Sequence, residues 1–161
     1  MIGDRQVIAM LNGQLTNELT AINQYFLHSR IFGHWGLERL SRKEYEESIG
    51  EMRHADRLIQ RILMLDGLPN LQGLHKVMVG EDVPEILGCD LKLELASQAH
   101  LRDSIAHCES VRDFVSRQIL EDILDDTEEH IDFLQTQLEL IKRVGLENYQ
   151  QSMMGDPKAG D

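Results

Sequence analysis

Glutamate and histidine residues recur at matched spacing in the two halves of this chain. In each half, a glutamate is followed 33 residues later by a second position, and three residues after that by a histidine. Every position of the second set lies 76 residues after its counterpart. The first set is Glu18, Glu51 and His54, and the second is Glu94, Thr127 and His130. The repeated offsets indicate two copies of one helical hairpin, whereas a lone Glu-x-x-His pair more often lies on a solvated face.

Carboxylates and imidazoles in this pattern can bind metal ions. Residues three apart on a helix lie on one face, so Glu51 and His54 can coordinate an ion that Glu18 meets from the next helix. Oxygen and nitrogen donors suit iron and leave positions free for oxygen or water, unlike a closed thiolate zinc site. One glutamate from each of two helices plus Glu-x-x-His from two others is the di-iron pattern of bundles. The sequence therefore predicts a di-iron site with the ligands Glu18, Glu51, His54, Glu94 and His130.

The elements that position these residues are predicted to be helices. Apolar residues recur at helical spacing, and the chain has only three prolines. Ser41 and Glu44 offer a capping box near the start of the second helix, Asp82 begins the third, and Gly145 ends the fourth. The helices are expected over residues 5–34, 38–65, 83–111 and 113–144, with a short fifth helix over 146–154.

The glycine-bearing stretch between the second and third helices fits no helix. A connector of this length can run the full height of a bundle, so its flanking helices need not be antiparallel. The predicted fold is all-α: a four-helix bundle with a long crossover and a short fifth C-terminal helix. The 161 residues form one domain, 1–161, with a polar tail from Gly155 to Asp161.

Composition and charge exclude several classes of function. The net charge of −12, with no cluster of Lys and Arg, argues against a nucleic-acid partner. No stretch approaches the length and apolarity of a membrane span, and the first residues do not resemble a secretion signal. Cys89 and Cys108 are interpreted as reduced thiols. These features predict a cytoplasmic protein without a membrane or nucleic-acid partner.

Several longer motifs resemble one family, the bacterioferritins, over nearly the whole chain. They are Met1-Ile-Gly-Asp4, Asn17 to Tyr25, Trp35-Gly-Leu37, Glu47-Ser-Ile49, Glu51 to Asp56, and Gly67 to Gln72. This resemblance implies that the predicted bundle is a ferritin-like one. The resemblance implies a hollow shell of twenty-four subunits that oxidises ferrous iron, stores the ferric mineral and returns it on reduction. It also implies a small ferredoxin-type reductant as a partner.

Met52 lies on a second apolar face of the second helix. On a helical wheel that starts at Glu51, the core residues fall within about 60°, whereas Met52 falls near 100°. Four apolar residues share its direction: Tyr45, Ile49, Ile59 and Leu63. The resemblance implies that Met52 binds haem b on a subunit twofold axis, opposite the same methionine of a second subunit. The alternative is that Met52 only fills a subunit interface.

Thr127 departs from the family pattern. The resemblance places a glutamate there, and a neutral hydroxyl is a poor substitute for a carboxylate that balances the charge of two metal ions. Asp126 and Glu128 are candidates to replace it. Leu58 and Phe133 also stand where active relatives are expected to have a redox-capable Tyr or Trp.

Three functions remain open from the sequence. The leading hypothesis is a haem-carrying subunit with an impaired di-iron site that relays electrons to the stored mineral. It would share a mixed shell with a second bacterioferritin subunit that oxidises iron, so ferroxidase activity of this chain alone is expected to be weak. The alternatives are a self-sufficient ferroxidase that oxidises Fe(II) with O2, and a non-storage ferritin-like protein such as a peroxide scavenger.

Overall fold

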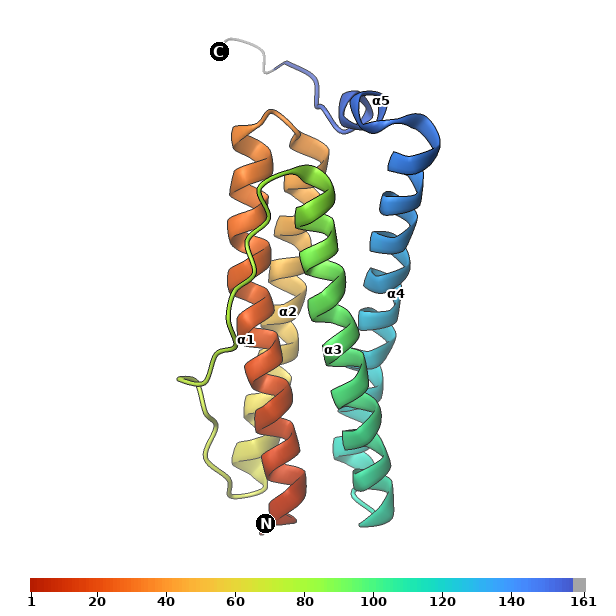
Figure 1. Cartoon of the computed structure of the whole chain (residues 1–161). Coiled ribbons are helices and arrows are strands. Elements are labelled where there is room, and N and C mark those ends of the chain that lie inside the picture. The colour runs from red at the N-terminus through yellow and green to blue at the C-terminus, as the bar shows by residue number, and fades with distance from the viewer. Residues whose placement is uncertain (158–161) are drawn as a thin grey trace.

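A computed structural model describes residues 1–157 of the chain as a bundle of four long α-helices with a short fifth helix at one end (Figure 1). The helices are α1 (Arg5–His34), α2 (Glu38–Met64), α3 (Val83–Ser110), α4 (Phe114–Val144) and α5 (Leu146–Ser152). The described residues form no strand. The predicted all-α, ferritin-like bundle is therefore confirmed, although 158–161, the end of the predicted polar tail, lie outside the described residues.

The helices form two hairpins, α1 with α2 and α3 with α4 (Figure 1). The connector after α2 climbs beside α1 to the opposite end of the bundle, so α2 and α3 run in the same direction. This is the long crossover that the sequence predicts. The helix α5 lies across the end of the bundle where α1 turns into α2.

Side chains and glycine set several of the helix ends. Asp4 accepts a hydrogen bond from the Val7 backbone N–H at 2.9 Å, and Asp82 accepts one from Glu85 at 2.8 Å. Gly145 ends α4 with a positive φ of 87°, which favours glycine.

The start of α2 differs from the expected capping box. Leu37 is the N-cap residue, and no side chain caps this end. Ser41 lies inside the first turns, where its backbone carbonyl accepts a hydrogen bond from the Ser29 hydroxyl at 2.7 Å. Glu44 is buried in the bundle and does not reach back to the helix end. The capping-box prediction was wrong because tertiary contacts, not local capping, fix this helix start.

The connector is held against α1 by polar side chains one helical turn apart. Thr20, Gln24 and His28 accept hydrogen bonds from the backbone N–H groups of His75, Met78 and Gly80, at 2.9, 3.0 and 3.2 Å respectively. Because these three side chains are four residues apart, they lie along one face of α1. The crossover is therefore fixed along the upper half of α1.

Apolar clusters fill the two ends of the bundle and leave a polar layer between them. One cluster includes Leu11, Leu58 and Leu120, and the other includes Phe32, Leu87 and Leu134. The predicted metal ligands come from the middle of each long helix, between these clusters. No helix within residues 1–157 is both long and apolar enough to cross a membrane.

Candidate metal centre

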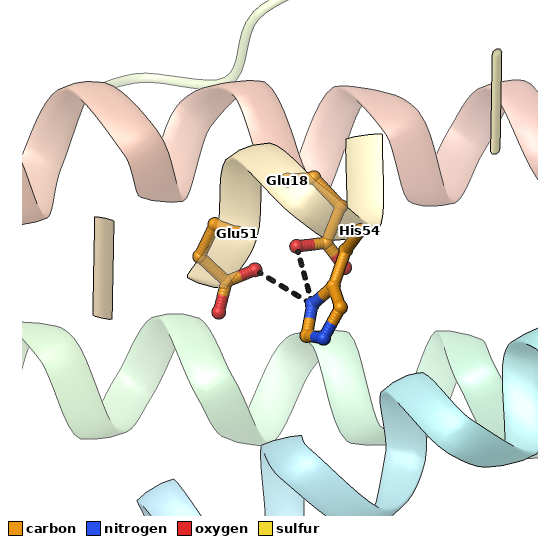
Figure 2. A group of neighbouring side chains, drawn as sticks. All are labelled: Glu18, Glu51 and His54. Carbon is orange, nitrogen blue, oxygen red and sulfur yellow. Dashed lines mark hydrogen bonds and ion pairs between the residues drawn. The ribbon is translucent and has the colours of Figure 1, made fainter. Parts of the chain in front are cut away.

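Three predicted ligands, Glu18, Glu51 and His54, meet in the middle of the bundle and are here called the first half-site (Figure 2). Glu18 comes from α1 and the other two from α2, and all three are buried. The Nδ1 atom of His54 lies 3.4 Å from a Glu18 oxygen and 3.6 Å from a Glu51 oxygen. One ligand atom from each residue falls within 4.8 Å of the others, so the three donors can converge on a single ion.

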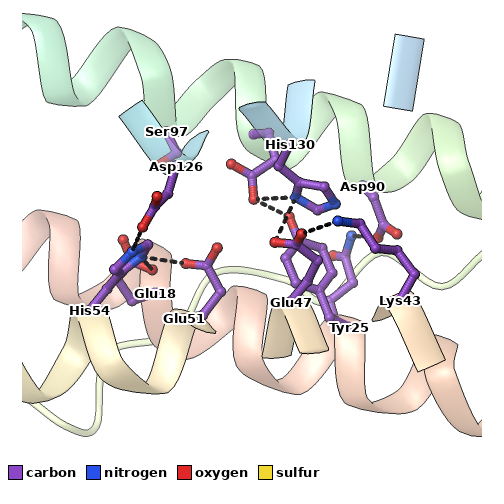
Figure 3. Close-up of polar contacts among 12 residues, drawn as sticks. Glu18, Tyr25, Lys43, Glu47, Glu51, His54, Asp90, Ser97, Asp126 and His130 are labelled. Atoms are coloured by element: carbon purple, nitrogen blue, oxygen red, sulfur yellow. Dashed lines mark hydrogen bonds and ion pairs between the residues drawn. The ribbon is translucent and has the colours of Figure 1, made fainter. Parts of the chain in front are cut away.

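Two further side chains hold the first half-site in place. Asp126 on α4 accepts a hydrogen bond from the Nε2 atom of His54 at 2.7 Å (Figure 3). This contact fixes the ring with Nδ1 toward the glutamates, as carboxylates often do for metal-binding histidines. Gln14 donates a hydrogen bond to the other oxygen of Glu18 at 2.9 Å.

The first half-site is charged in a way that favours a cation. Burial raises the pKa of Glu18, against the lowering effect of His54. Burial lowers the pKa of His54, but hydrogen bonds and charges from Glu18 and then Asp126 outweigh it and raise this pKa to about 9. Without a metal ion, a proton on His54 therefore balances the carboxylates. A bound cation would take over this role.

The remaining predicted ligands, Glu94 on α3 and His130 on α4, form the second half-site. Nδ1 of His130 lies 3.2 Å from a Glu94 oxygen, and the Tyr25 hydroxyl donates a short hydrogen bond to that same oxygen (Figure 3). Glu47 on α2 brings an oxygen to 3.6 Å from the same nitrogen. Burial lowers the pKa of His130, but Glu94 and then Glu47 raise it above its usual value.

The two half-sites are unequal. Within residues 1–157, Glu94 and His130 belong to no group of three donors that lie as close together as the first half-site. Thr127 is buried at the position that the duplication matches to Glu51. The other carboxylates beside it are engaged elsewhere: Asp126 holds His54, and Glu128 accepts hydrogen bonds from Gln98 and Arg102 at the surface. Neither of these two carboxylates contacts His130, which pairs with Glu94 and Glu47.

A cavity of about 200 Å³ between α2 and α4 reaches both half-sites. Its lining is mostly charged and consists of Lys43, Glu46, Glu47, Gly50, Glu51, His54, Asp126, Glu129 and His130. Lys43 pairs with Glu47 at 3.0 Å. The acidic excess of this lining favours the entry of cations.

A second buried polar cluster lies on the other side of Tyr25, and sequence analysis missed it. His28, Glu44 and Asp90 also offer three donor atoms within 4.8 Å of one another. His28 uses both ring nitrogens: Nε2 accepts a hydrogen bond from the Gly80 backbone N–H, and Nδ1 lies 2.9 Å from the Oδ1 atom of Asp90. The same Asp90 oxygen accepts a hydrogen bond from the Gln24 side chain. The only signal in the sequence is that Asp90 lies one helical turn before Glu94.

A shared proton would satisfy the unpaired oxygens of this second cluster. One oxygen of Glu44 and one of Asp90 are buried without a hydrogen-bond partner. Burial, and then the charge of Asp90, raise the pKa of Glu44 well above its ordinary value. A protonated Glu44 can donate to Asp90, which satisfies both oxygens.

Met52 directly follows Glu51 but lies on the outside of α2, whereas Glu51 is buried. Its side chain is 52% exposed, and Leu63 and Tyr45 on the same stripe are 56% and 40% exposed. The second apolar face that the helical wheel predicts is therefore uncovered in a single subunit.

Comparisons with known proteins agree with the helices and the ligand pattern. Residues 8–144 match the ferritin-like domain family. A bacterioferritin of Brucella melitensis is 47% identical over 151 residues, which cover 94% of each chain. Bacterioferritin BfrA of Mycobacterium tuberculosis is 45% identical over 157 residues, or 98% of this chain and 99% of the other. A bacterioferritin of Rhodobacter capsulatus is 46% identical over 149 residues, or 92% of each. Together with the bundle and its central carboxylates and histidines, these matches show that the chain belongs to the bacterioferritin family of iron-storage proteins.

Proposed function

We propose that this chain is the haem-carrying subunit of an iron-storage shell and oxidises iron poorly by itself. The observation that carries this proposal is the pairing of Met52, exposed on an apolar stripe, with Thr127, buried where the centre needs a carboxylate. The first feature supports a bound haem, and the second argues against an efficient di-iron reaction. Among the described residues, the nearest carboxylate to His130 apart from Glu94 is that of Glu47, at 3.6 Å. Asp126 and Glu128 are bonded to other side chains.

The residues around Met52 fit haem b chemically. A thioether is a soft ligand that suits haem iron and tends to raise its reduction potential. The flanking Ile49, Ile59 and Leu63 offer an apolar surface for the porphyrin at a contact between two subunits. Haem bound there would supply one-electron transfer, and Met52 would hold its iron.

The wider role follows from the family. The subunits would assemble into a shell of twenty-four, in the cytoplasm, around a ferric mineral. Haem would relay electrons from a small ferredoxin-type reductant to the mineral. A second bacterioferritin subunit with a complete carboxylate set would oxidise incoming ferrous iron, so this chain would store and release iron in a mixed shell.

Haem reconstitution tests the first half of this proposal. The purified chain is titrated with haemin, and binding is followed by the visible spectrum of the reduced form. We expect about one haem per two subunits, and loss of this stoichiometric binding in Met52→Leu. Met64→Leu is the matched control, because Met64 is similarly exposed on the same helix. Stoichiometric haem binding by Met52→Leu would refute the assignment.

A second candidate function is a self-sufficient ferroxidase, with O2 as the electron acceptor. The observation in its favour is Glu47, whose oxygen lies 3.6 Å from His130 and could complete the second half-site. Its pairing with Lys43 at 3.0 Å opposes this role, because the carboxylate is already neutralised. Rapid ferrous oxidation that Glu47→Gln abolishes and Glu46→Gln leaves intact would favour this candidate.

A further inference from the structure

The internal duplication allows the two half-sites to be compared position by position. A shift of 76 residues relates Glu18 to Glu94 and His54 to His130, which are the same residue types. The same shift relates Glu51 to Thr127, and Gly50 to Asp126. The two halves therefore match in two positions and differ in two adjacent ones.

Both differences favour the first half-site. Glu51 completes the three donors around one point, whereas Thr127 leaves the second half-site with Glu94 and His130. Asp126 fixes the outer nitrogen of His54 at 2.7 Å. The equivalent position for His130 is Gly50, which has no side chain to offer.

The space around Gly50 and the partners of Glu94 complete the contrast. A Cβ atom at Gly50 would meet nothing within 4 Å, so no other side chain occupies the place where a side chain at position 50 would begin. In the second half-site, the Glu94 oxygen that faces His130 already accepts a hydrogen bond from the Tyr25 hydroxyl. A second ion would have Glu94, already bonded to a tyrosine, and His130, and the further carboxylate near His130, Glu47 at 3.6 Å, is paired with Lys43.

We propose that this subunit holds one metal ion, in the first half-site alone, and that Asp126 is the positioning residue for His54. The proposal rests on the proposed function, which takes this centre to be an altered di-iron site. It goes further in two ways. It assigns a single metal ion to the remaining centre, and it names Gly50, besides Thr127, as a cause of the weak second half-site. The residues present fit one ion and do not fit the pair.

The number of bound ions tests the single-ion assignment. The purified chain is titrated with Co²⁺ without haem, and binding is followed by the visible absorbance of the ion and by metal analysis after desalting. Glu51→Gln, which lacks a first-half-site donor, gives the background. We expect about one Co²⁺ per subunit above this background, and about two in Thr127→Glu combined with Gly50→Asp. The single variant Thr127→Glu is measured as well, in case the double variant does not fold.

Two results would overturn the single-ion assignment. One is the binding of two Co²⁺ of similar affinity by the unmodified chain. The other is an unchanged count of one in the folded Thr127→Glu and double variants, because the named differences would then not be the cause.

The role of Asp126 is tested by affinity for the same ion. Asp126→Ala should weaken Co²⁺ binding about 10- to 100-fold, the usual effect of losing a carboxylate behind a metal-bound histidine. Asp126→Asn keeps an acceptor for the ring N–H and should recover part of this loss. Asp125→Ala removes an exposed neighbouring carboxylate and should leave affinity unchanged. Equal affinity in Asp126→Ala and Asp125→Ala would show that Asp126 does not position His54.

These outcomes separate the inference from the proposed function. Haem binding at Met52 is measured on the same protein and does not depend on the ion count. Two bound Co²⁺ with slow ferrous oxidation would refute the single-ion centre alone, whereas two bound ions with rapid oxidation would refute both.

Discussion

At the residue scale, the centre depends on which oxygen or nitrogen of each side chain faces inward. The duplicated spacing is enough to predict five ligands, because a 33-residue offset and a Glu-x-x-His step fix helix faces. The structure brings Glu18, Glu51 and His54 together and places Glu94 beside His130. That these residues bind iron stays a prediction.

The partners of those residues could not be predicted from spacing. The sequence offers Asp126 as a substitute ligand, but the structure places it behind His54. The approach of Glu47 to His130 depends on the rotation of α2 against α4. Helical periodicity gives the face of one helix and not its rotation against a neighbour, so contacts between helices need the packed structure.

The buried carboxyl group of Glu44 leads to a prediction at this scale. Burial and the charge of Asp90 raise the pKa of Glu44 well above its usual value in the folded state. When the pKa of a carboxyl group is higher in the folded state than in the unfolded state, the free energy of unfolding falls as the pH rises above the pKa of the unfolded state. Glu44→Gln should therefore raise the melting temperature at pH 8, with a benefit that shrinks toward pH 5. Thermal unfolding at several pH values measures this.

Glu46→Gln is the control for that experiment, because it makes the same chemical change two residues away at an exposed site. Its effect should not grow with pH. A Glu44→Gln chain that is less stable than the original at pH 8 would show that the buried pair does not hold a proton.

At the element scale, helix existence was predictable and helix starts were less so. Asp82 and Gly145 act as expected, because a cap or a positive φ is a local property. The start of α2 is set by tertiary contacts, which is why Ser41 and Glu44 misled the local interpretation. Charged groups between helices hold these elements in register.

A buried ion pair links α2 to the start of α4. Arg61 donates to Asp113 at 2.8 Å and to Ser116 at 2.8 Å, and both members of the ion pair are largely buried. Arg61→Ala should lower the free energy of unfolding by about 3 kcal/mol, because it leaves a buried carboxylate without its cation. Chemical denaturation at fixed protein concentration measures the change.

The matched control is Arg57→Ala. Arg57 pairs with Asp122 at 3.0 Å between the same two helices, but both side chains are more than 40% exposed. Its loss should cost about 0.5 kcal/mol, as for other exposed pairs. Equal losses in the two variants would contradict the importance of burial here.

The crossover has a tight point at Gly80. A Cβ atom there would press on the backbone nitrogen of Ile86, which cannot move without shifting α3. Gly80→Ala should therefore lower the free energy of unfolding by about 2 kcal/mol, in the range for overpacked sites. Gly88→Ala is the control, since a Cβ there meets nothing within 4 Å and alanine favours the helix. A Gly80→Ala chain as stable as Gly88→Ala would refute the close contact.

At the scale of the whole molecule, a single subunit leaves the apolar stripe of α2 exposed to solvent. Met52 and Leu63 are each more than half exposed on this stripe. The sequence predicts the stripe from the helical wheel, but one chain does not reveal what covers it. We propose that haem and a second subunit cover it, and that the assembled protein carries haem yet oxidises iron poorly.

The most direct test is ferrous oxidation in air by the purified, haem-loaded chain, with two equivalents of iron per subunit, followed as ferric absorbance. We expect no rapid phase for the unmodified chain and a rapid phase in Thr127→Glu. A rapid phase in the unmodified chain would refute the proposed function, because it would show a working di-iron reaction despite Thr127.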